Sequence, residues 1–204
     1  IFPDSFVLYM PKDIVSGDFY WLSQPQNPDE TQDQILAVCD CTGHGVPGAF
    51  MSMIGIELLS NLVQEKKISD PALIIERMQN SIRFALRRQN ASAELRDGMD
   101  IGILRISRSP HPDSKIQITF AGANFTLHLF EKEKPFELVE VQGDHSFDFE
   151  NNTFSNHSLT LSKGDTILLN SDGFADQLGG HKGKKFSKRK LAMLFTTVCG
   201  QPMY

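Results

Sequence analysis

The chain of 204 residues has little of several features that would place it in a specialised class. Its three cysteines are an odd number, which disfavours a disulfide framework and indicates a reducing compartment, by default the cytoplasm. Its formal net charge of −5 gives no electrostatic case for nucleic-acid binding. No apolar run approaches the ~20 residues that span a bilayer, and the N-terminus lacks a basic region followed by an apolar stretch. We therefore predict a soluble domain without membrane contact.

The hydrophobic content of 40% is sufficient for one substantial core, and we predict a single domain over residues 1–204. The sequence begins abruptly at Ile1, inside a stretch with the pattern of folded structure, so we expect it to belong to a longer protein. The cations gather once, in a run that is either a surface facing a phosphoprotein or an ordinary solvated face. The run comprises Lys182, Lys184, Lys185, Lys188, Arg189 and Lys190.

The most informative stretch is a strand followed by a glycine-rich turn and an apolar helix. Residues 34–39 have the length and composition of a buried strand, which places Asp40 at a strand end. Gly43 and Gly45 permit a tight turn, and Pro47 suits the first turn of a helix. That helix is apolar nearly all round, so we predict that it is buried. A carboxylate beside a turn and a helix N-terminus that favour anions suggests a metal and a phosphate.

Periodicity and turn residues predict strands, then two helices, then further strands. Predicted strands cover residues 6–10, 13–22, 34–39, 99–106, 115–120, 125–130, 137–141, 158–161 and 166–170. A second helix is predicted from Pro71, capped by Asp70, to near Asn90, and a last helix over 191–198. The loop over 23–33 predicts that the strands on either side of it are antiparallel neighbours. A turn over 121–124 likewise predicts a hairpin between the strands that flank it.

Two further aspartates repeat the pattern of Asp40. Asp18 follows Gly17, a glycine that marks a bulge or a close backbone approach, and Asp172 follows an apolar strand and precedes a glycine. A half-buried Asp18 needs a partner, and a metal ion and backbone donors in the bulge are both candidates. If the strands bring the three carboxylates together, Mg²⁺ or Mn²⁺ would offset their repulsion. Two such ions would suit the attack of a bridging water on phosphorus.

Five motifs resemble those of a known family and occur in its order. They are VSGDFY at 15–20, DCTGHGVPGA at 40–49, DGMD at 97–100, FAGAN at 120–124 and SDG at 171–173. This order is typical of SpoIIE/RsbU-type phosphatases, the bacterial branch of the PP2C-like (PPM) metal-dependent serine/threonine phosphatases. The resemblance covers essentially the whole chain. It implies an α+β fold, a four-layer α-β-β-α sandwich with two antiparallel sheets flanked by helices, and a centre of two Mn²⁺ or Mg²⁺ ions at one edge.

At the matching positions the resemblance assigns metal-binding roles. Asp18 and Asp40 would hold the ions, the backbone carbonyl of Cys41 would contribute, and Asp172 would complete one site. His44 would orient a water or act as an acid toward the leaving serine oxygen, and packing against the helix start is the alternative. Three other acids, Asp97, Asp100 and Asp176, are expected to support the ligands or to be structural. We rank Asp176 above the other two because it follows Asp172 by four residues.

The sequence departs from the family pattern at its C-terminal end. The family usually ends with a strand preceded by an Asp-Asp-x-Thr pattern that supplies a metal ligand, and this sequence stops at Tyr204 before such a pattern. We therefore expect a domain without its C-terminal strand, either because the chain is a fragment or because the protein lacks that ligand.

The leading hypothesis is a metal-dependent phosphatase that hydrolyses phosphoserine or phosphothreonine on a signalling protein. The resemblance implies an anti-anti-sigma-type regulator as substrate and an upstream sensor domain, and it allows a homodimer. The alternative is a catalytically silent module of the same fold that binds a phosphoprotein. A zinc site at Cys39, Cys41 and His44 lacks a fourth ligand at a recognised spacing. A nucleotide site at the glycine turn lacks a following Walker lysine.

Overall fold

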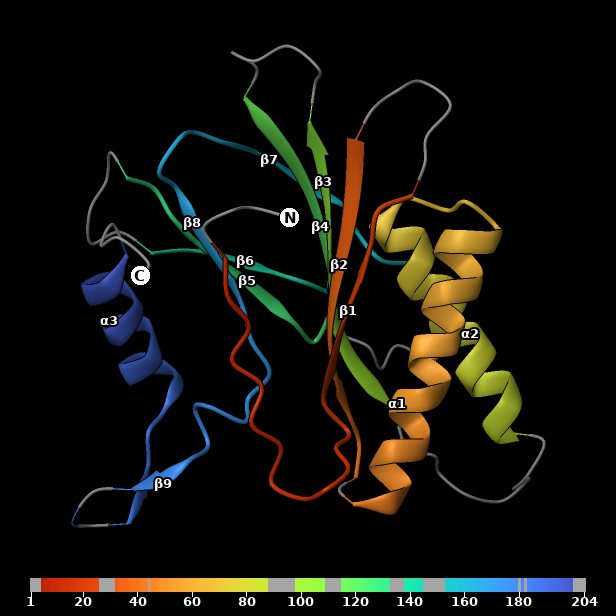
Figure 1. Cartoon of the computed structure of the whole chain (residues 1–204), viewed down its shortest axis with the longest axis horizontal. Coiled ribbons are helices and arrows are strands. Elements are labelled where there is room, and N and C mark those ends of the chain that lie inside the picture. Colours follow the sequence, from red (N-terminus) through yellow and green to blue (C-terminus); the bar gives the residue numbers. More distant parts are fainter. Residues whose placement is uncertain are drawn as a thin grey trace.

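The structure is a computed structural model that describes residues 5–25, 32–43, 45–87, 98–108, 115–132, 138–144, 153–179, 181 and 183–199. Two antiparallel sheets form its centre (Figure 1). The first has the strand order β1-β2-β3-β4-β7, and the second has the order β6-β5-β8. A short antiparallel hairpin, β9 with β10, stands apart from both.

The strands of the first sheet are β1 (Phe19–Ser23), β2 (Gln32–Cys41), β3 (Met99–Arg108), β4 (Ile116–Ala123) and β7 (His157–Leu161). Those of the second are β5 (Thr126–Phe130), β6 (Leu138–Gln142) and β8 (Thr166–Leu169), and those of the hairpin are β9 (Leu178–Gly179) and β10 (Lys184–Lys185). The helices are α1 (Val46–Leu59), its π-helical continuation η1 (Ser60–Glu65), α2 (Pro71–Arg87) and α3 (Lys188–Val198).

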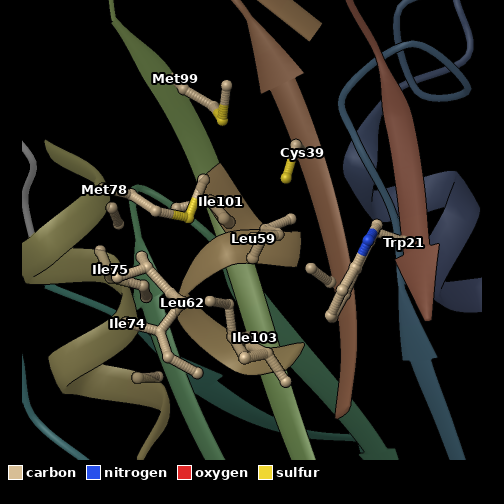
Figure 2. Packing of buried hydrophobic residues seen from close by; sticks show 14 of the residues in the cluster. Trp21, Cys39, Leu59, Leu62, Ile74, Ile75, Met78, Met99, Ile101 and Ile103 are labelled. Carbon is tan, nitrogen blue, oxygen red and sulfur yellow. The ribbon is translucent and has the colours of Figure 1, made fainter. Parts of the chain in front are cut away.

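Helices α1 and α2 cover the outer face of the five-stranded sheet (Figure 1). The predicted cap of α2 is confirmed, because the backbone N–H of Leu73 donates to Asp70 Oδ1 at 2.8 Å. The apolar face of α2, including Ile74 and Met78, packs with strand residues such as Ile101 in one buried cluster (Figure 2). Burial of this apolar area is the main favourable term that holds the helices to the sheet.

A second apolar cluster lies between the two sheets. It joins Leu104 and Phe120 of the first sheet to Leu127 and Leu129 of β5. On the far side of the second sheet, the ring of Phe195 in α3 stacks on Phe130 of β5 with 5.7 Å between centroids. The layers therefore run helices, sheet, sheet, helix, and the predicted four-layer α+β sandwich is confirmed.

The structure corrects the predicted strands near the N-terminus and after β4. Residues 6–10 form no strand, and their large apolar side chains are exposed, Phe6 by 70%. Of the predicted strand 13–22, only the end is in β1. The expected hairpin of 115–120 with 125–130 is wrong, because β4 pairs with β7 and β5 lies in the other sheet. The chain changes sheets at Asn124, whose φ of 51° is left-handed.

The composition of helix α1 predicted burial on all sides, and this prediction is wrong. Met51, Gly55 and Leu59 face the core, whereas Phe50 and Met53 are 62% and 66% exposed. Together with η1 it is also long and apolar enough to cross a membrane by length and composition, with a mean hydropathy of 1.5, contrary to the sequence expectation. Because its inner side packs into the cluster with β2 and β3, the helix is an integral element of this fold.

Replacing Ser187 by Gly is expected to stabilise the domain by about 1 kcal/mol, since non-glycine residues are strained in its backbone conformation. Ser187 precedes α3 with φ 80° and ψ 148°, and its side chain makes no capping hydrogen bond that the change would remove. The measurement is the urea midpoint of unfolding, which should rise without a change in slope. An equal or lower midpoint would contradict the expectation.

Candidate functional site

Four aspartates from separate segments meet at one end of the sandwich. Asp40, the second-last residue of β2, is paired directly across the sheet with Asp100 of β3. Asp18 immediately precedes β1, whose first residue pairs with Cys39 on the other side of β2. Asp172 follows the end of β8 in the second sheet. Register places Asp18, Asp40 and Asp100 near one another, and the hydrogen bond from Ser171 to Asp18 brings the segment with Asp172 to them.

Hydrogen bonds connect these acids to one another and to neighbouring polar groups. The hydroxyl of Ser171 donates to Asp18 Oδ2 at 2.6 Å, and the carboxyl of Asp18 is close enough to Asp40 to raise its pKa. The amide Nδ2 of Asn124 donates to Asp100 Oδ1 at 2.9 Å. The carboxylates of Asp18 and Asp100 are therefore oriented by donors from the turns that follow β8 and β4, respectively.

Burial and neighbouring acids raise the pKa of Asp40 and of Asp100. Burial first, and then the charges of Asp18 and Asp172, raise the pKa of Asp40 to about 7. The pKa of Asp100 is also raised, chiefly by burial, while the hydrogen bond from Asn124 acts in the opposite direction. Concentrated negative charge of this kind favours a bound cation, which would allow the carboxylates to ionise together.

Backbone contacts between glycines explain the motif spacing around Asp40. A Cβ atom at Gly48 would lie 2.5 Å from the carbonyl oxygen of Gly43 and 3.1 Å from the Cα of Gly17. A Cβ at Gly17 would lie 2.9 Å from the carbonyl oxygen of Cys41. The close backbone approach predicted at Gly17 is therefore present. Only glycine allows the start of α1, the turn after β2 and the segment before Asp18 to pack this tightly.

Cys41 is suited to act through its backbone and not through its sulfur. Burial, followed by the charge of Asp40, raises the pKa of the Cys41 thiol to about 12, and burial also raises the pKa of Cys39. Both thiols therefore stay neutral at physiological pH, and thiolate coordination of zinc is disfavoured.

Of the remaining residues considered from sequence, two are not described and one lies in an ion pair. His44 and Asp97 lie outside the residues that the structure describes. Asp176, ranked above Asp100 from sequence, binds the ammonium of Lys185 at 2.5 Å, whereas Asp100 faces Asp40. Ser171 and Asn124, which sequence reasoning did not single out as supports, belong to the SDG and FAGAN motifs, and that membership was the available signal.

The donor set fits hard divalent ions. All four acids offer oxygen ligands, which Mg²⁺ and Mn²⁺ prefer. Among the described residues no group of three or more His, Cys, Asp or Glu side chains is arranged to hold one ion. Mg²⁺ is nevertheless commonly held by one or two carboxylates with water completing its shell, and Asp18 and Asp40 are two neighbouring carboxylates of that kind.

Comparison with known proteins identifies the family. The model of the SpoIIE family, described as stage II sporulation protein E, matches residues 30–203, well over half of the chain. The chain belongs to the SpoIIE family. No curated protein matches it.

Solved structures place the SpoIIE-family fold among PP2C-type phosphatase domains. The SiaA PP2C domain of Pseudomonas aeruginosa is 30% identical, with a TM-score of 0.74 over 97% of this chain and 72% of that one. The RsbU and RsbW domains of a Mycobacterium tuberculosis protein are 18% identical, with a TM-score of 0.65 over 92% of this chain and 47% of that one. RsbX in complex with magnesium is 16% identical, with a TM-score of 0.51 over 93% of this chain and 83% of that one. The latter two similarities concern the fold alone.

Proposed function

We propose that this SpoIIE-family domain is a metal-dependent protein phosphatase that hydrolyses phosphoserine or phosphothreonine by attack of water on phosphorus. The observation that carries the proposal is the meeting of Asp18, Asp40 and Asp172 at one end of a PP2C-type fold. These carboxylates and the Cys41 carbonyl would hold two Mn²⁺ or Mg²⁺ ions. When bound, such ions would supply positive charge to the phosphoryl group and increase the acidity of water.

The chain's own residues would hold the ligands in place. Ser171 donates to one carboxylate oxygen of Asp18, and Asn124 donates to one carboxylate oxygen of Asp100. The glycine contacts keep the Cys41 carbonyl against the segment before Asp18. We further propose that His44 acts on a water or on the leaving oxygen.

The substrate that we propose is a phosphorylated regulatory protein of the anti-anti-sigma type. This substrate class is the one implied by the resemblance of the sequence motifs to SpoIIE/RsbU-type phosphatases. An upstream sensor domain and a homodimer are part of the same proposal, as is a cytoplasmic location.

Removal of divalent metal is expected to abolish hydrolysis of p-nitrophenyl phosphate and of a phosphoserine peptide, since the carboxylate cluster then lacks its counter-charge. The experiment measures both rates after EDTA treatment and after return of Mn²⁺ or Mg²⁺. Restoration by either ion supports the metal mechanism. Full activity in EDTA would refute it.

The alternative is a silent phosphoprotein-binding module of the same fold. It is favoured by the lack, among the described residues, of three clustered side chains able to hold one ion. Absence of hydrolysis at saturating Mn²⁺, together with retained binding of a phosphoprotein, would establish this alternative in place of the enzyme.

A further inference from the structure

A basic surface follows directly after Asp172. We define the basic hairpin surface as the hairpin of β9 and β10 with the first turn of α3, at the lower left of Figure 1. It borders an open cavity of about 350 Å³. The cavity is lined by Phe174, Gln177, Leu178, Gly179, Lys184, Phe186 and Lys190.

Backbone hydrogen bonds join this surface to the acidic site. The N–H of Asp176 donates to the carbonyl of Asp172 at 2.9 Å, and the N–H of Ser187 donates to the carbonyl of Ala175 at 2.7 Å. Ala175 is buried, so the base of the hairpin is fixed behind Asp172. A partner seated in the cavity would therefore lie next to the carboxylates.

The positive charge of the surface is largely unpaired. From Gln177 to the last residue the sequence contains no Asp or Glu. Lys185 is paired with Asp176, whereas four cations have no carboxylate within salt-bridge distance in the described part of the chain. These four are Lys184, Lys188, Arg189 and Lys190. Unpaired charge of one sign, in a chain whose net charge is −5, gives a local field that attracts an acidic partner.

The cavity adds an apolar component. The rings of Phe174 and Phe186 meet edge to face at 5.4 Å, and Leu178 is 72% exposed beside them. The ammonium of Lys190 lies 5.9 Å from the centroid of the Phe186 ring. An apolar side chain with acidic neighbours is complementary to this combination.

We propose that the basic hairpin surface binds an acidic segment of the phosphoprotein substrate, beside the phosphorylated residue, with an apolar side chain in the cavity. This inference rests on the proposed function and adds a substrate class to it. A protein segment fits better than a nucleic acid, because the continuous phosphates of a nucleic acid would also run over the adjacent acids, Asp100 and Asp172.

The test compares two phosphoserine peptides, one flanked by several acidic residues and a leucine, the other by serines. In the Lys184→Glu/Lys190→Glu variant the KM for the acidic peptide is expected to rise about tenfold or more, with little change for the serine peptide. Turnover of p-nitrophenyl phosphate should stay within about twofold, since neither lysine has a role in the chemistry. An unchanged KM for the acidic peptide would overturn the proposal.

The matched control is Lys115→Glu, an exposed lysine just before β4, whose other end approaches the acidic site. A rise in KM equal to that of the double variant would show a general charge effect and would also overturn the proposal. Thermal unfolding and far-UV circular dichroism verify that both variants fold.

Fluorescence anisotropy of the labelled acidic peptide separates this inference from the proposed function. If the wild type hydrolyses no substrate, the phosphatase proposal fails, yet loss of peptide binding in the double variant alone still supports the surface. Binding that is equal in wild type and variant would overturn it. A DNA duplex or anionic vesicles bound more tightly than the peptide, with the same loss in the variant, would assign the surface to that ligand and overturn it too.

Discussion

Replacing Asp40 by Asn is expected to lower metal-dependent hydrolysis of p-nitrophenyl phosphate by more than about 100-fold. Changes to groups that merely support a ligand typically cost 10–100-fold in metal affinity or activity, and loss of the ligand itself should exceed that range. We choose Asp40 because the charges of Asp18, Asp172 and Asp100 all act on its carboxyl, which places it at the centre of the acidic group. Rates at several Mn²⁺ concentrations provide the measurement.

The same substitution should stabilise the metal-free protein. The folded state raises the pKa of Asp40 from 3.8 to about 7, so between these pH values it keeps a proton that the unfolded chain releases. The wild type therefore loses stability as pH rises from about 4 to about 7. Asn carries no charge, and the variant should be more stable by about 1–2 kcal/mol above that range, after allowance for solvent screening of a half-buried carboxyl.

Urea unfolding in EDTA at pH 4 and pH 8 measures this difference, which should be close to zero at the lower pH. Asp13→Asn, an exposed carboxylate before the site, is the control and should change neither activity nor pH dependence. If Asp40→Asn destabilised the metal-free protein at pH 8, the account of repelling carboxylates would be wrong. Activity equal to that of the wild type would remove Asp40 from the mechanism.

Replacing Arg105 by Met is expected to destabilise the domain by about 3 kcal/mol, because a buried charge would lose its partner. The side chain of Asp33 is fully buried, and its Oδ2 accepts from Arg105 Nη2 at 2.6 Å and from Nε at 2.8 Å. Its other oxygen has no hydrogen-bond partner among the described residues, so the guanidinium provides the compensation. The free energy of unfolding from urea titration is the quantity to compare.

The double variant Asp33→Leu/Arg105→Met should recover most of that loss, since it removes the buried charge together with its partner. Arg77→Met, on the exposed side of α2, is the matched control and should stay within about 0.5 kcal/mol of the wild type. A loss for Arg105→Met no larger than that of the control would show that the pair is not needed. Metal-dependent activity should survive, because Asp33 and Asp40 lie near opposite ends of β2.

Local signals were sufficient for several elements of the fold. The cap at Asp70 with Pro71 marked the start of α2 at the observed position, because capping depends on a few adjacent residues. Alternating residues marked β4, but alternation does not say which strand is the neighbour, and the partner of 125–130 was therefore predicted in the wrong sheet. Composition alone also could not show which side of α1 is exposed.

In the acidic site, too, some residues had a local sequence signal and others were placed only by the tertiary structure. Asp18 and Asp172 were singled out because each adjoins a glycine near a predicted strand, and Asp40 because a glycine-rich turn follows its strand, patterns that belong to the local sequence. The position of Asp100 opposite Asp40 could not be predicted in the same way, since it follows from the register of β2 and β3. The pairing of Arg105 with Asp33, 72 residues apart, had no local signal at all.

By itself the amino-acid order determined the family, the succession of strands and helices, and the acids that carry the proposed chemistry, because each depends on neighbours along the chain. Only the tertiary structure decided which strands pair, which side of α1 stays in solvent, and that a basic surface stands beside the acids. Those outcomes depend on how segments far apart in the chain share buried area, hydrogen bonds and charge.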